Sequence, residues 1–574
     1  MSTRSAQKMA TIKAVVAEDR WNASPAQRGF GLSMLWRRLA VTLRAGPAIL
    51  LWLMLAGCAQ AAPSTPATQV APPAAWTPPA LQSGQETYPI GSPVLTDLWV
   101  DPLLGDDGRS GASRDQALAT ISEAWRRIPA GQPLQGTGYR INLMAGDYPE
   151  SVYPQYWEDR HGTYDFPIIL ASADGPGAAR LLGNMVNVFD VDYLYLLGLR
   201  LENEGDVFHC EQCRHLLIRD SVFDGGNRQA HETIKINQSQ HVYIENSDIG
   251  GSYENAIDFV AVQHGHILNN RIHDADDWCI YLKGGSAYFT LAGNEIDHCG
   301  TGGFTAGQGT GFEFMAQPWL HYEAYALKFF NNVIHDTEGA GFGVNGGYDI
   351  LLAYNTLYRV GSRSHGMEFV FGGRGCDGDT ARCAANRDLG GWGTATVGGD
   401  EPIPNRNVYV YNNLLYNPPG FRSQWQHFAI HGPRTPPADS GIPNPSRTDD
   451  NLQIRGNLIW NGPADLPLGI GDESEGCWSD NPTCNQTQLR ADNSINQLQP
   501  SLIDPAGGDF RPTPGSLAGV HTVPLPAFPL WDSFTPPVPA GDLANHVPVD
   551  RAGRPRPAGG DAPGAYSGQE AAQG

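Results

Sequence analysis

The stretch "LLIRDSVF" at residues 216–223 sets a pattern that returns along much of the chain. Two apolar residues stand two positions apart, a small or amide residue follows three positions later, and another apolar residue closes the motif. "VYIENSDI" at 242–249 and "GHILNNRI" at 265–272 repeat it. The remaining copies lie at 194–201, 289–296, 327–334, 350–357, 408–416 and 452–460.

The spacing between copies indicates how they pack. We measure the separation between the small or amide positions of successive copies, from Leu199 to Asn457. These steps are 22, 26, 23, 24, 38, 23, 58 and 44 residues. A unit of about 20–30 residues cannot bury its own apolar face, so it must stack on its neighbours. Alternating apolar residues favour short strands, and glycines and amides favour tight turns. The sequence therefore predicts an all-β fold, a right-handed parallel β-helix with loop insertions at the long steps.

A β-propeller is the main alternative fold. It needs about four strands per 40–50 residues, joined by antiparallel hairpins. Here the unit is half that size and Asn-Gly hairpin signals are scarce. We interpret the recurrent asparagines as a structural ladder at turns, since Asn tolerates left-handed backbone and bonds local backbone groups.

The two ends of the chain differ from the repeats. Residues 1–58 end in an apolar run and "LAGC", which resembles the lipobox of bacterial lipoproteins and implies export, cleavage before Cys58 and lipidation of its thiol. Translation could start at Met34, and a membrane anchor is the alternative reading of the apolar run. Residues 59–94 read as an Ala/Pro-rich tether, 95–540 as the β-helix domain, and 541–574 as a Pro/Gly-rich tail or cap.

The segment before the first repeats predicts a capped start. Residues 99–131 contain a strand, a Gly/Asp turn and an amphipathic helix over 122–127. This arrangement resembles the opening of many secreted right-handed β-helix proteins, in which a helix covers the open first rung. We expect the same capping helix here.

Cysteine usage and charge limit the function classes. Eight cysteines follow Cys58, an even number that suits an oxidising compartment. Two pairs close short loops and are predicted disulfides, Cys376/Cys383 and Cys477/Cys484; Cys210/Cys213 and Cys279/Cys299 are left open between disulfides and other states. The net charge of −22 makes nucleic acid and anionic membranes poor partners. An acidic polymer would need bridging cations, and we expect a monomer.

Three consecutive repeats carry the densest polar group of residues. Pointing the apolar pairs of residues 234/236, 257/259 and 280/282 inward turns their neighbours outward, in the columns Lys235–Asp258–Tyr281 and Asn237–Val260–Lys283. With strands about 4.8 Å apart, nearby acidic residues fall within reach of Lys283. Clustered carboxylates need counter-charges, so we predict calcium ligands among them; a solvated acidic turn is the alternative. The predicted ligands are Glu254, Asp258, Asp276 and Asp277.

Lys283 carries a resemblance to known enzymes. It ends a strand in "DDWCIYLKGGSAY" at 276–288 and is followed by Gly284 and Gly285. The sequence here resembles calcium-dependent polysaccharide lyases of the parallel β-helix fold, the pectate, alginate and chondroitin lyases. The resemblance implies Lys283 as base, with Asp277 and neighbouring aspartates at the calcium. It also implies an acidic, uronate-containing polysaccharide as substrate.

The chain departs from that pattern at the acid. The coil "GGFTAGQGTGFEFM" at 302–315 lacks the arginine that alginate and chondroitin lyases have there. Three residues stand as possible acids: Tyr281, His298 and His321. Three arginines are expected to reach a uronate carboxylate: Arg271, Arg363 and Arg374.

Two other classes stay open. A parallel β-helix glycoside hydrolase would use paired carboxylates such as Asp258, Asp276 and Asp277 as acid and base. A non-catalytic surface solenoid would bind glycans through aromatic side chains in the insertions. Those aromatics are Trp319, Tyr322, Tyr325, Trp392 and Trp425.

Overall fold

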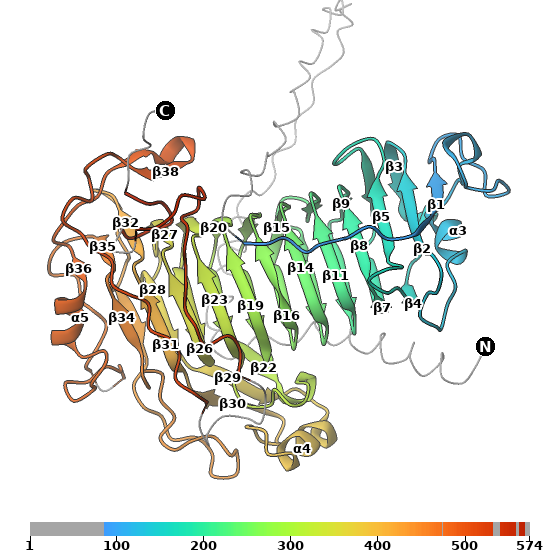
Figure 1. Ribbon diagram of the computed structural model, residues 1–574. Helices are drawn as coiled ribbons and strands as arrows, with labels where there is room; N and C mark the ends of the chain where they lie inside the picture. Colours follow the sequence, from blue (N-terminus) through green and yellow to red (C-terminus); the bar gives the residue numbers. More distant parts are fainter. Residues whose placement is uncertain (1–84, 473, 532–539, 558–561, 569–574) are drawn as a thin grey trace, which may run out of the picture. The chain divides into compact units, whose positions relative to one another are not determined.

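A computed structural model describes residues 85–472, 474–531, 540–557 and 562–568 (Figure 1). The predicted signal segment with Met34 and Cys58, and the tether up to residue 84, lie outside the described residues. Within the described ranges, no helix is both long and apolar enough to cross a bilayer.

The described chain is a parallel β-helix whose strands form one 33-stranded sheet wound into three faces (Figure 1). Most rungs contribute a short strand to each face, and the strands of one face pair in parallel from rung to rung. The repeated motif of the sequence forms this rung, as predicted.

Face A carries the strands on which the candidate site is built. It contains β4 (Trp157–His161), β7 (Val186–Asp192), β10 (Phe208–Glu211), β13 (Ala230–Asn237), the second half of β15 (Asp248–Val260), β18 (Trp278–Lys283), β21 (Gly302–Gly307), β25 (Ala340–Asn345), β28 (Met367–Val370) and β33 (Phe428–Ile430).

Face B follows the turn after face A. It contains β1 (Leu95–Val100), β2 (Gly138–Leu143), β5 (Ile168–Ser172), β8 (Leu194–Leu197), β11 (Arg214–Arg219), β14 (Gln240–Glu245), β16 (Gln263–Leu268), β19 (Ser286–Ala292), β23 (Ala324–Phe330), β26 (Gly347–Ala353), β31 (Arg406–Tyr411) and β34 (Gln453–Arg455).

Face C completes the rung. It contains β3 (Gly146–Pro149), β6 (Ala179–Leu182), β9 (Arg200–Glu202), β12 (Val222–Asp224), the first half of β15, β17 (Arg271–Ala275), β20 (Glu295–Cys299), β24 (Val333–Thr337), β27 (Thr356–Val360), β32 (Leu414–Asn417), β35 (Leu458–Asn461) and β36 (Ser494–Ile495).

The asparagines at the motif's centre form the predicted ladder between faces B and C. The backbone N–H of Asn294 donates to Oδ1 of Asn332 at 2.9 Å, and that of Asn332 donates to Asn355 at 3.0 Å. Their side-chain amides donate to backbone carbonyls of the preceding rung. Since these side chains are completely buried, the ladder satisfies polar groups that stacking would otherwise leave unpaired. The residue before each one has a left-handed backbone, as at Asn331 with φ 56°.

Helices occur at the ends and in one insertion. Helix α3 (Ile121–Arg126) is the predicted cap: Thr120 accepts a hydrogen bond from the N–H of Glu123, and Trp125 packs on Trp157 at 4.9 Å between ring centroids. The other helices of the described residues are α4 (Thr380–Asp388) and α5 (Gln486–Asp492), with short 3₁₀ turns η1 (Arg114–Gln116), η2 (Glu150–Val152), η3 (Phe312–Phe314) and η4 (Pro505–Gly507).

An insertion lobe borders face A. It combines η3 and α4 with β22 (Gly309–Gly311), β29 (Gly372–Cys376) and β30 (Gly398–Ile403). The lobe touches the ends of face A strands, because Glu323 accepts from the N–H of Gly284 at 2.9 Å and from Thr310 at 2.6 Å. A separate hairpin of β37 (Leu502–Asp504) and β38 (Asp509–Pro512) follows β36.

Both ends of the described chain pack along the rungs (Figure 1). Residues 85–94, the last part of the predicted tether, lie against face B, where Tyr88 stacks on Tyr243 at 4.4 Å. At the other end, Phe528 stacks on Tyr409 and Arg551 donates to the carbonyl of Asn294. The last ten residues of the predicted tether are thus part of the folded domain.

Four disulfides are present, Cys210–Cys213, Cys279–Cys299, Cys376–Cys383 and Cys477–Cys484. The two predicted loop-closing pairs are confirmed, and the two pairs that were left open are disulfides as well.

Candidate functional site

The register on face A matches the prediction. Lys235 pairs with Asp258 and Asp258 with Tyr281, while Val260 pairs with Lys283. The intervening apolar side chains are completely buried in the core: Ile234, Ile236, Ile257, Phe259, Ile280 and Leu282. Because side chains alternate along a strand, the polar columns face outward.

Lys283 and Tyr281 form a close pair on this face. The ammonium nitrogen donates to the phenol oxygen at 2.9 Å and lies 4.2 Å from the centre of the ring. Burial raises the pKa of Tyr281 well above its usual value, and the charges of Asp258 and Glu232 raise it further. The phenol therefore keeps its proton and stands next to a potential base.

The glycines after Lys283 have a local structural reason. Gly284 has a φ of +66°, and a Cβ there would lie 2.9 Å from a methyl group of Val260. Glycine thus allows the chain to turn directly after Lys283, so that no bulky side chain follows the ammonium group.

Asp258 is the most unusual carboxylate on the face. Its side chain is 1% exposed and lies 3.5 Å from the ammonium of Lys235. Within the described part of the chain, neither of its oxygens accepts a hydrogen bond. Lys235 balances the charge of Asp258, but both carboxylate oxygens keep hydrogen-bonding capacity that a ligand or a water molecule can fill.

Glu232 lies beside it on the neighbouring strand. It accepts hydrogen bonds from the backbone and side-chain amides of Asn255 at 3.2 and 3.3 Å. Burial raises the pKa of Glu232 well above its usual range, and the charge of Asp258 adds to the effect. Two buried carboxyl groups on adjacent strands disfavour simultaneous ionisation.

Glu254 and Asp277 occupy the turn that leads into these strands, on consecutive rungs, with the Asp277 N–H donating to the Glu254 carbonyl at 3.0 Å. Burial raises the pKa of Asp277, and the charge of Glu254 adds to this. Burial also acts to raise the pKa of Glu254, but the hydrogen bond and charge of His231 outweigh it and lower the value. His231 Nε2 lies 3.2 Å from Glu254 Oε2. Two neighbouring carboxyl groups thus have opposite protonation tendencies.

The predicted calcium ligands do not converge. Asp276 is 52% exposed and pairs with Arg228, which also contacts Asp274 on face C. It therefore points to the opposite side of the turn from Asp277. Glu254 and Asp258 lie on face A but are engaged with His231 and Lys235. As they stand, the four carboxylates do not form a single calcium site, because Asp276 lies apart from the other three; the calcium site stays a prediction.

The three predicted arginines differ in position. Arg374 is completely buried and ion-paired with the equally buried Glu323, so the prediction that it reaches a substrate is wrong. Arg271 pairs with Asp297 on face C and does not share a face with Lys283. Arg363 is exposed and donates to the carbonyl of Gly300 at 3.2 Å. It alone among them borders the site, since the adjacent Thr301 hydrogen-bonds Asp277.

Of the possible acids, only Tyr281 contacts Lys283. His298 pairs with Asp297 on face C, and His321 packs against Trp392 in the insertion lobe. Four of the five predicted sugar platforms, Trp319, Tyr322, Tyr325 and Trp392, are buried together in a cluster, whereas Trp425 is 56% exposed.

Glu368 is a further carboxylate on this face. The register runs from Tyr281 through Thr305 and Gly343 to Glu368, whose Oε2 lies 2.9 Å from His365 Nε2. The long insertions hid the rung count, although the position of Glu368 within the strand "MEFV" carried the signal.

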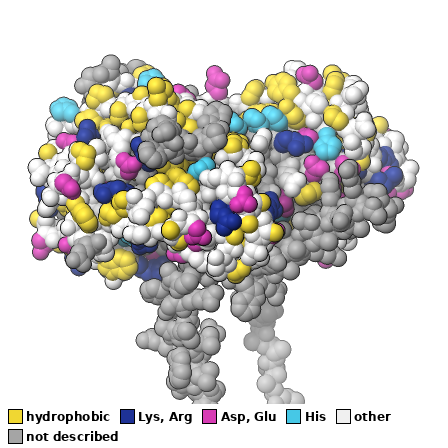
Figure 2. All heavy atoms as spheres, turned by 90° about the horizontal axis from the view of Figure 1, so that it is seen from below, with side chains coloured by type: hydrophobic (Ala, Val, Ile, Leu, Met, Phe, Trp, Pro, Cys, Tyr) yellow, Lys and Arg dark blue, Asp and Glu magenta, His cyan; other side chains and the backbone are white. Residues whose placement is uncertain are grey.

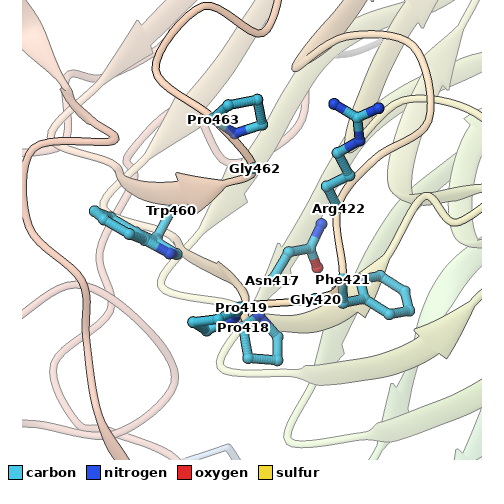
Figure 3. A pocket seen from close by; sticks show the side chains of 9 residues that line it. All are labelled: Asn417, Pro418, Pro419, Gly420, Phe421, Arg422, Trp460, Gly462 and Pro463. Carbon is cyan, nitrogen blue, oxygen red and sulfur yellow. The ribbon is translucent and has the colours of Figure 1, made fainter.

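A pocket of about 440 Å³ lies elsewhere, beyond the ends of β32 and β35 (Figure 3). It is lined by Pro418, Phe421, Arg422 and Trp460 among others. Its lining contains no acidic side chain, so it offers no acid–base pair. The surface seen in Figure 2 mixes acidic, basic and apolar side chains without a continuous field of one sign.

Comparison with known proteins supports the fold. Residues 202–377 match the family model for a right handed beta helix region. No curated protein matches the chain. Among solved structures, pectate lyase Pel9A is 14% identical with a TM-score of 0.35, covering 57% of this chain and 77% of its own. A rhamnogalacturonan lyase is 12% identical with a TM-score of 0.33, covering 63% and 87%. The A-module of mannuronan C-5 epimerase AlgE6 from Azotobacter vinelandii is 12% identical with a TM-score of 0.32, covering 56% and 85%. Likenesses of this size do not assign an activity.

Proposed function

We propose that this protein cleaves a uronate-containing polysaccharide by β-elimination, with Lys283 as the base and Tyr281 as the acid. The observation that carries the proposal is the 2.9 Å contact between the Lys283 ammonium nitrogen and the Tyr281 hydroxyl on the outward side of face A.

The pair can complete a proton cycle. Neutral Lys283 takes the proton next to the uronate carboxylate, the electron pair forms a carbon–carbon double bond, and the bond to the leaving glycosidic oxygen breaks. Tyr281 gives its proton to that oxygen. Because burial disfavours the resulting phenolate, Tyr281 recovers a proton from the Lys283 ammonium 2.9 Å away. Base and acid lie side by side, which suits removal of the proton and the oxygen from one side of the sugar ring.

Asp277 supports the substrate's carboxylate in this proposal. Its pKa is raised by burial, and it lies close enough to Lys283 for the two charges to interact. A protonated Asp277 donates a hydrogen bond to the uronate carboxylate and makes the neighbouring proton more acidic. Calcium dependence stays a prediction.

The proposal includes an exported, lipid-anchored monomer. The lipobox-like "LAGC" ending at Cys58 supports the anchor, and the four disulfides suit an oxidising compartment.

Hydrolysis is the second candidate. The supporting observation is the pair Asp277 and Glu254, whose pKa values are shifted in opposite directions on neighbouring rungs. Such a pair is the arrangement that a glycosidase needs, with Asp277 as general acid and Glu254 as base or nucleophile.

One experiment separates the two. The protein is incubated with a panel of uronate polymers, with calcium or with chelator, and both ultraviolet absorbance and reducing ends are followed. Elimination produces unsaturated ends that absorb, and Lys283→Met abolishes them, whereas Lys328→Met on face B has no effect. Reducing ends without absorbance support hydrolysis, and the absence of both from every polymer contradicts the proposal for those substrates.

A further inference from the structure

Four groups of potential metal ligands occur in the described residues. Two combine a carboxylate with cysteines that form disulfides, so their sulfurs are not available as thiolates. A third, Glu295 with Asp297 and His335, lies on face C, where Arg271 pairs with Asp297 and Arg551 approaches Glu295. The fourth, at the turn into face A, has a different environment.

We propose that His231, Glu232 and Glu254 bind a first-row transition-metal dication such as Zn²⁺ or Mn²⁺. Each offers one ligand atom, and these atoms all lie within 4.8 Å of one another. A cation placed among an imidazole nitrogen and two carboxylate oxygens at this spacing needs only small side-chain adjustments to reach bonding distances of about 2.0–2.2 Å.

Asp206 lies behind His231 and supports its role as a metal ligand. His231 directs Nε2 toward Glu254 at 3.2 Å, while its Nδ1 lies 3.7 Å from Asp206. The same Asp206 carboxylate accepts the backbone N–H of Glu232 at 3.0 Å. The 3.7 Å separation is longer than a hydrogen bond, so a small movement of the ring would let Asp206 orient the imidazole and strengthen its donor atom.

Orphaned buried oxygens next to this group provide independent support. Asn255 contacts Glu232 through its amide nitrogen, yet its own Oδ1 is buried and accepts nothing from any described residue. Asp258 lies on the same strand and is 1% exposed. Both of its carboxylate oxygens are buried and accept no hydrogen bond from a described residue. These atoms supply additional oxygen donors, directly or through metal-bound water.

The local charge favours a dication. With His231 neutral, as a ligand must be, four carboxyl groups face the ammonium groups of Lys235 and Lys283; they belong to Asp206, Glu232, Glu254 and Asp258. Acidic groups outnumber basic ones, and desolvated like charges repel one another unless a cation binds.

The donor set points away from calcium. Calcium prefers six to eight oxygen ligands, whereas an imidazole nitrogen is a ligand for zinc, manganese and their neighbours. The site shares Glu254 with the predicted calcium set but excludes Asp276. The inference does not depend on the proposed elimination, since it concerns binding alone.

The test is metal binding by the full chain after treatment with chelator and dialysis. Zn²⁺, Mn²⁺ and Ca²⁺ are each titrated by calorimetry, and bound metal is measured by elemental analysis. We expect one Zn²⁺ or Mn²⁺ per chain, with calcium at least about tenfold weaker. His231→Ala and Glu254→Gln should each weaken binding by at least about 10- to 100-fold, because loss of an outer-shell partner alone typically costs that much and these residues are direct ligands.

His298→Ala provides the matched control, because this histidine also pairs with an acidic neighbour but lies on face C. It should bind the metal as the unchanged chain does. Absence of Zn²⁺ and Mn²⁺ binding, preference for calcium, or binding that survives both His231→Ala and Glu254→Gln would overturn the proposal. Circular dichroism of each variant shows whether a loss of binding reflects a loss of fold.

Discussion

Faces A and C of the β-helix both carry a column of ionisable side chains, but these side chains have different partners on the two faces. On face C, register aligns His273, Asp297 and His335 on successive rungs. Each of these histidines contacts two carboxylates: His273 contacts Asp248 and Asp274, and His335 contacts Glu295 and Asp336. On face A, Asp258 has the Lys235 ammonium 3.5 Å away, yet neither of its oxygens accepts a hydrogen bond from a described residue.

This difference favours a structural role for face C and the proposed chemistry for face A. Face C alternates imidazole and carboxylate so that each charge is compensated, which ties the rungs together. Face A brings several carboxylates onto neighbouring strands and leaves buried oxygens unsatisfied, which costs stability of about 1–3 kcal/mol for each group. Such a cost is retained where an external ligand or substrate completes the arrangement.

The largest expected difference between the faces concerns activity. Tyr281→Phe removes the proposed acid and should lower kcat by about 10²- to 10⁴-fold, the usual contribution of a positioned proton donor. Tyr358→Phe, in the face C column, should leave kcat unchanged. Initial rates of absorbance increase on the cleaved polymer measure both. Equal rates for the two variants would remove Tyr281 from the mechanism.

The pH dependence of stability should come from face C. Burial acts to lower the pKa of His273 and of His335, but their carboxylate partners outweigh it and raise both to about 9. The unfolded histidine has a pKa of about 6.5, so the stabilisation is complete below about pH 6.5 and is lost as the pH rises through 9. The free energy of unfolding should fall by up to about 5 kcal/mol between pH 7 and pH 10.

Denaturant unfolding at a series of pH values measures this effect. The double variant His273→Gln, His335→Gln should be less stable at pH 7 and should show a flatter profile up to pH 10. An unchanged slope in the variant would assign the alkaline loss to other groups.

A third prediction compares the two buried aspartates directly. Asp297→Asn removes a buried charged acceptor of hydrogen bonds from Arg271 and His298 and should destabilise the fold by about 2 kcal/mol. Asp258→Asn removes a carboxylate that accepts no described hydrogen bond, so it should cost no more than about 1 kcal/mol while reducing activity. Chemical denaturation of both variants gives the comparison, and a larger loss for Asp258→Asn would show that its pairing with Lys235 is structural.

The sequence could predict the fold and the register of face A because the repeated apolar pairs fix which side chains point inward. A shift of one residue would have placed Lys283 in the core. The pattern also predicted the asparagine ladder, since amides recur at one position of the rung. These are periodic signals that each rung repeats.

The site could be predicted only in part, because its remaining features are not periodic. Arg374 meets Glu323 across 51 residues through the insertion lobe, a pairing that no spacing reveals. Glu368 reaches face A only when the rungs within the insertions are counted. Asp276 and Asp277 lie on opposite sides of a turn that follows the left-handed backbone of Asp274, with φ 53°.

Substitutions of the adjacent Asp276 and Asp277 have the smallest expected effects, and they compare the two sides of one turn directly. Asp277 interacts with Lys283 and Glu254 on face A, whereas Asp276 is exposed and pairs with Arg228 toward face C. Asp277→Ala should therefore reduce kcat/KM clearly. Asp276→Ala should change it by less than about twofold and alter stability by no more than about 1 kcal/mol, as expected for an exposed ion pair. Parallel assays with and without calcium distinguish this division from the predicted four-carboxylate site. If Asp276→Ala abolished activity in the presence of calcium, the turn would have to rearrange when the metal binds. Asp276 would then belong to the site on face A. If both variants kept full activity, the acidic turn would belong to the fold, and the chemistry of face A would rest on Lys283 and Tyr281 alone.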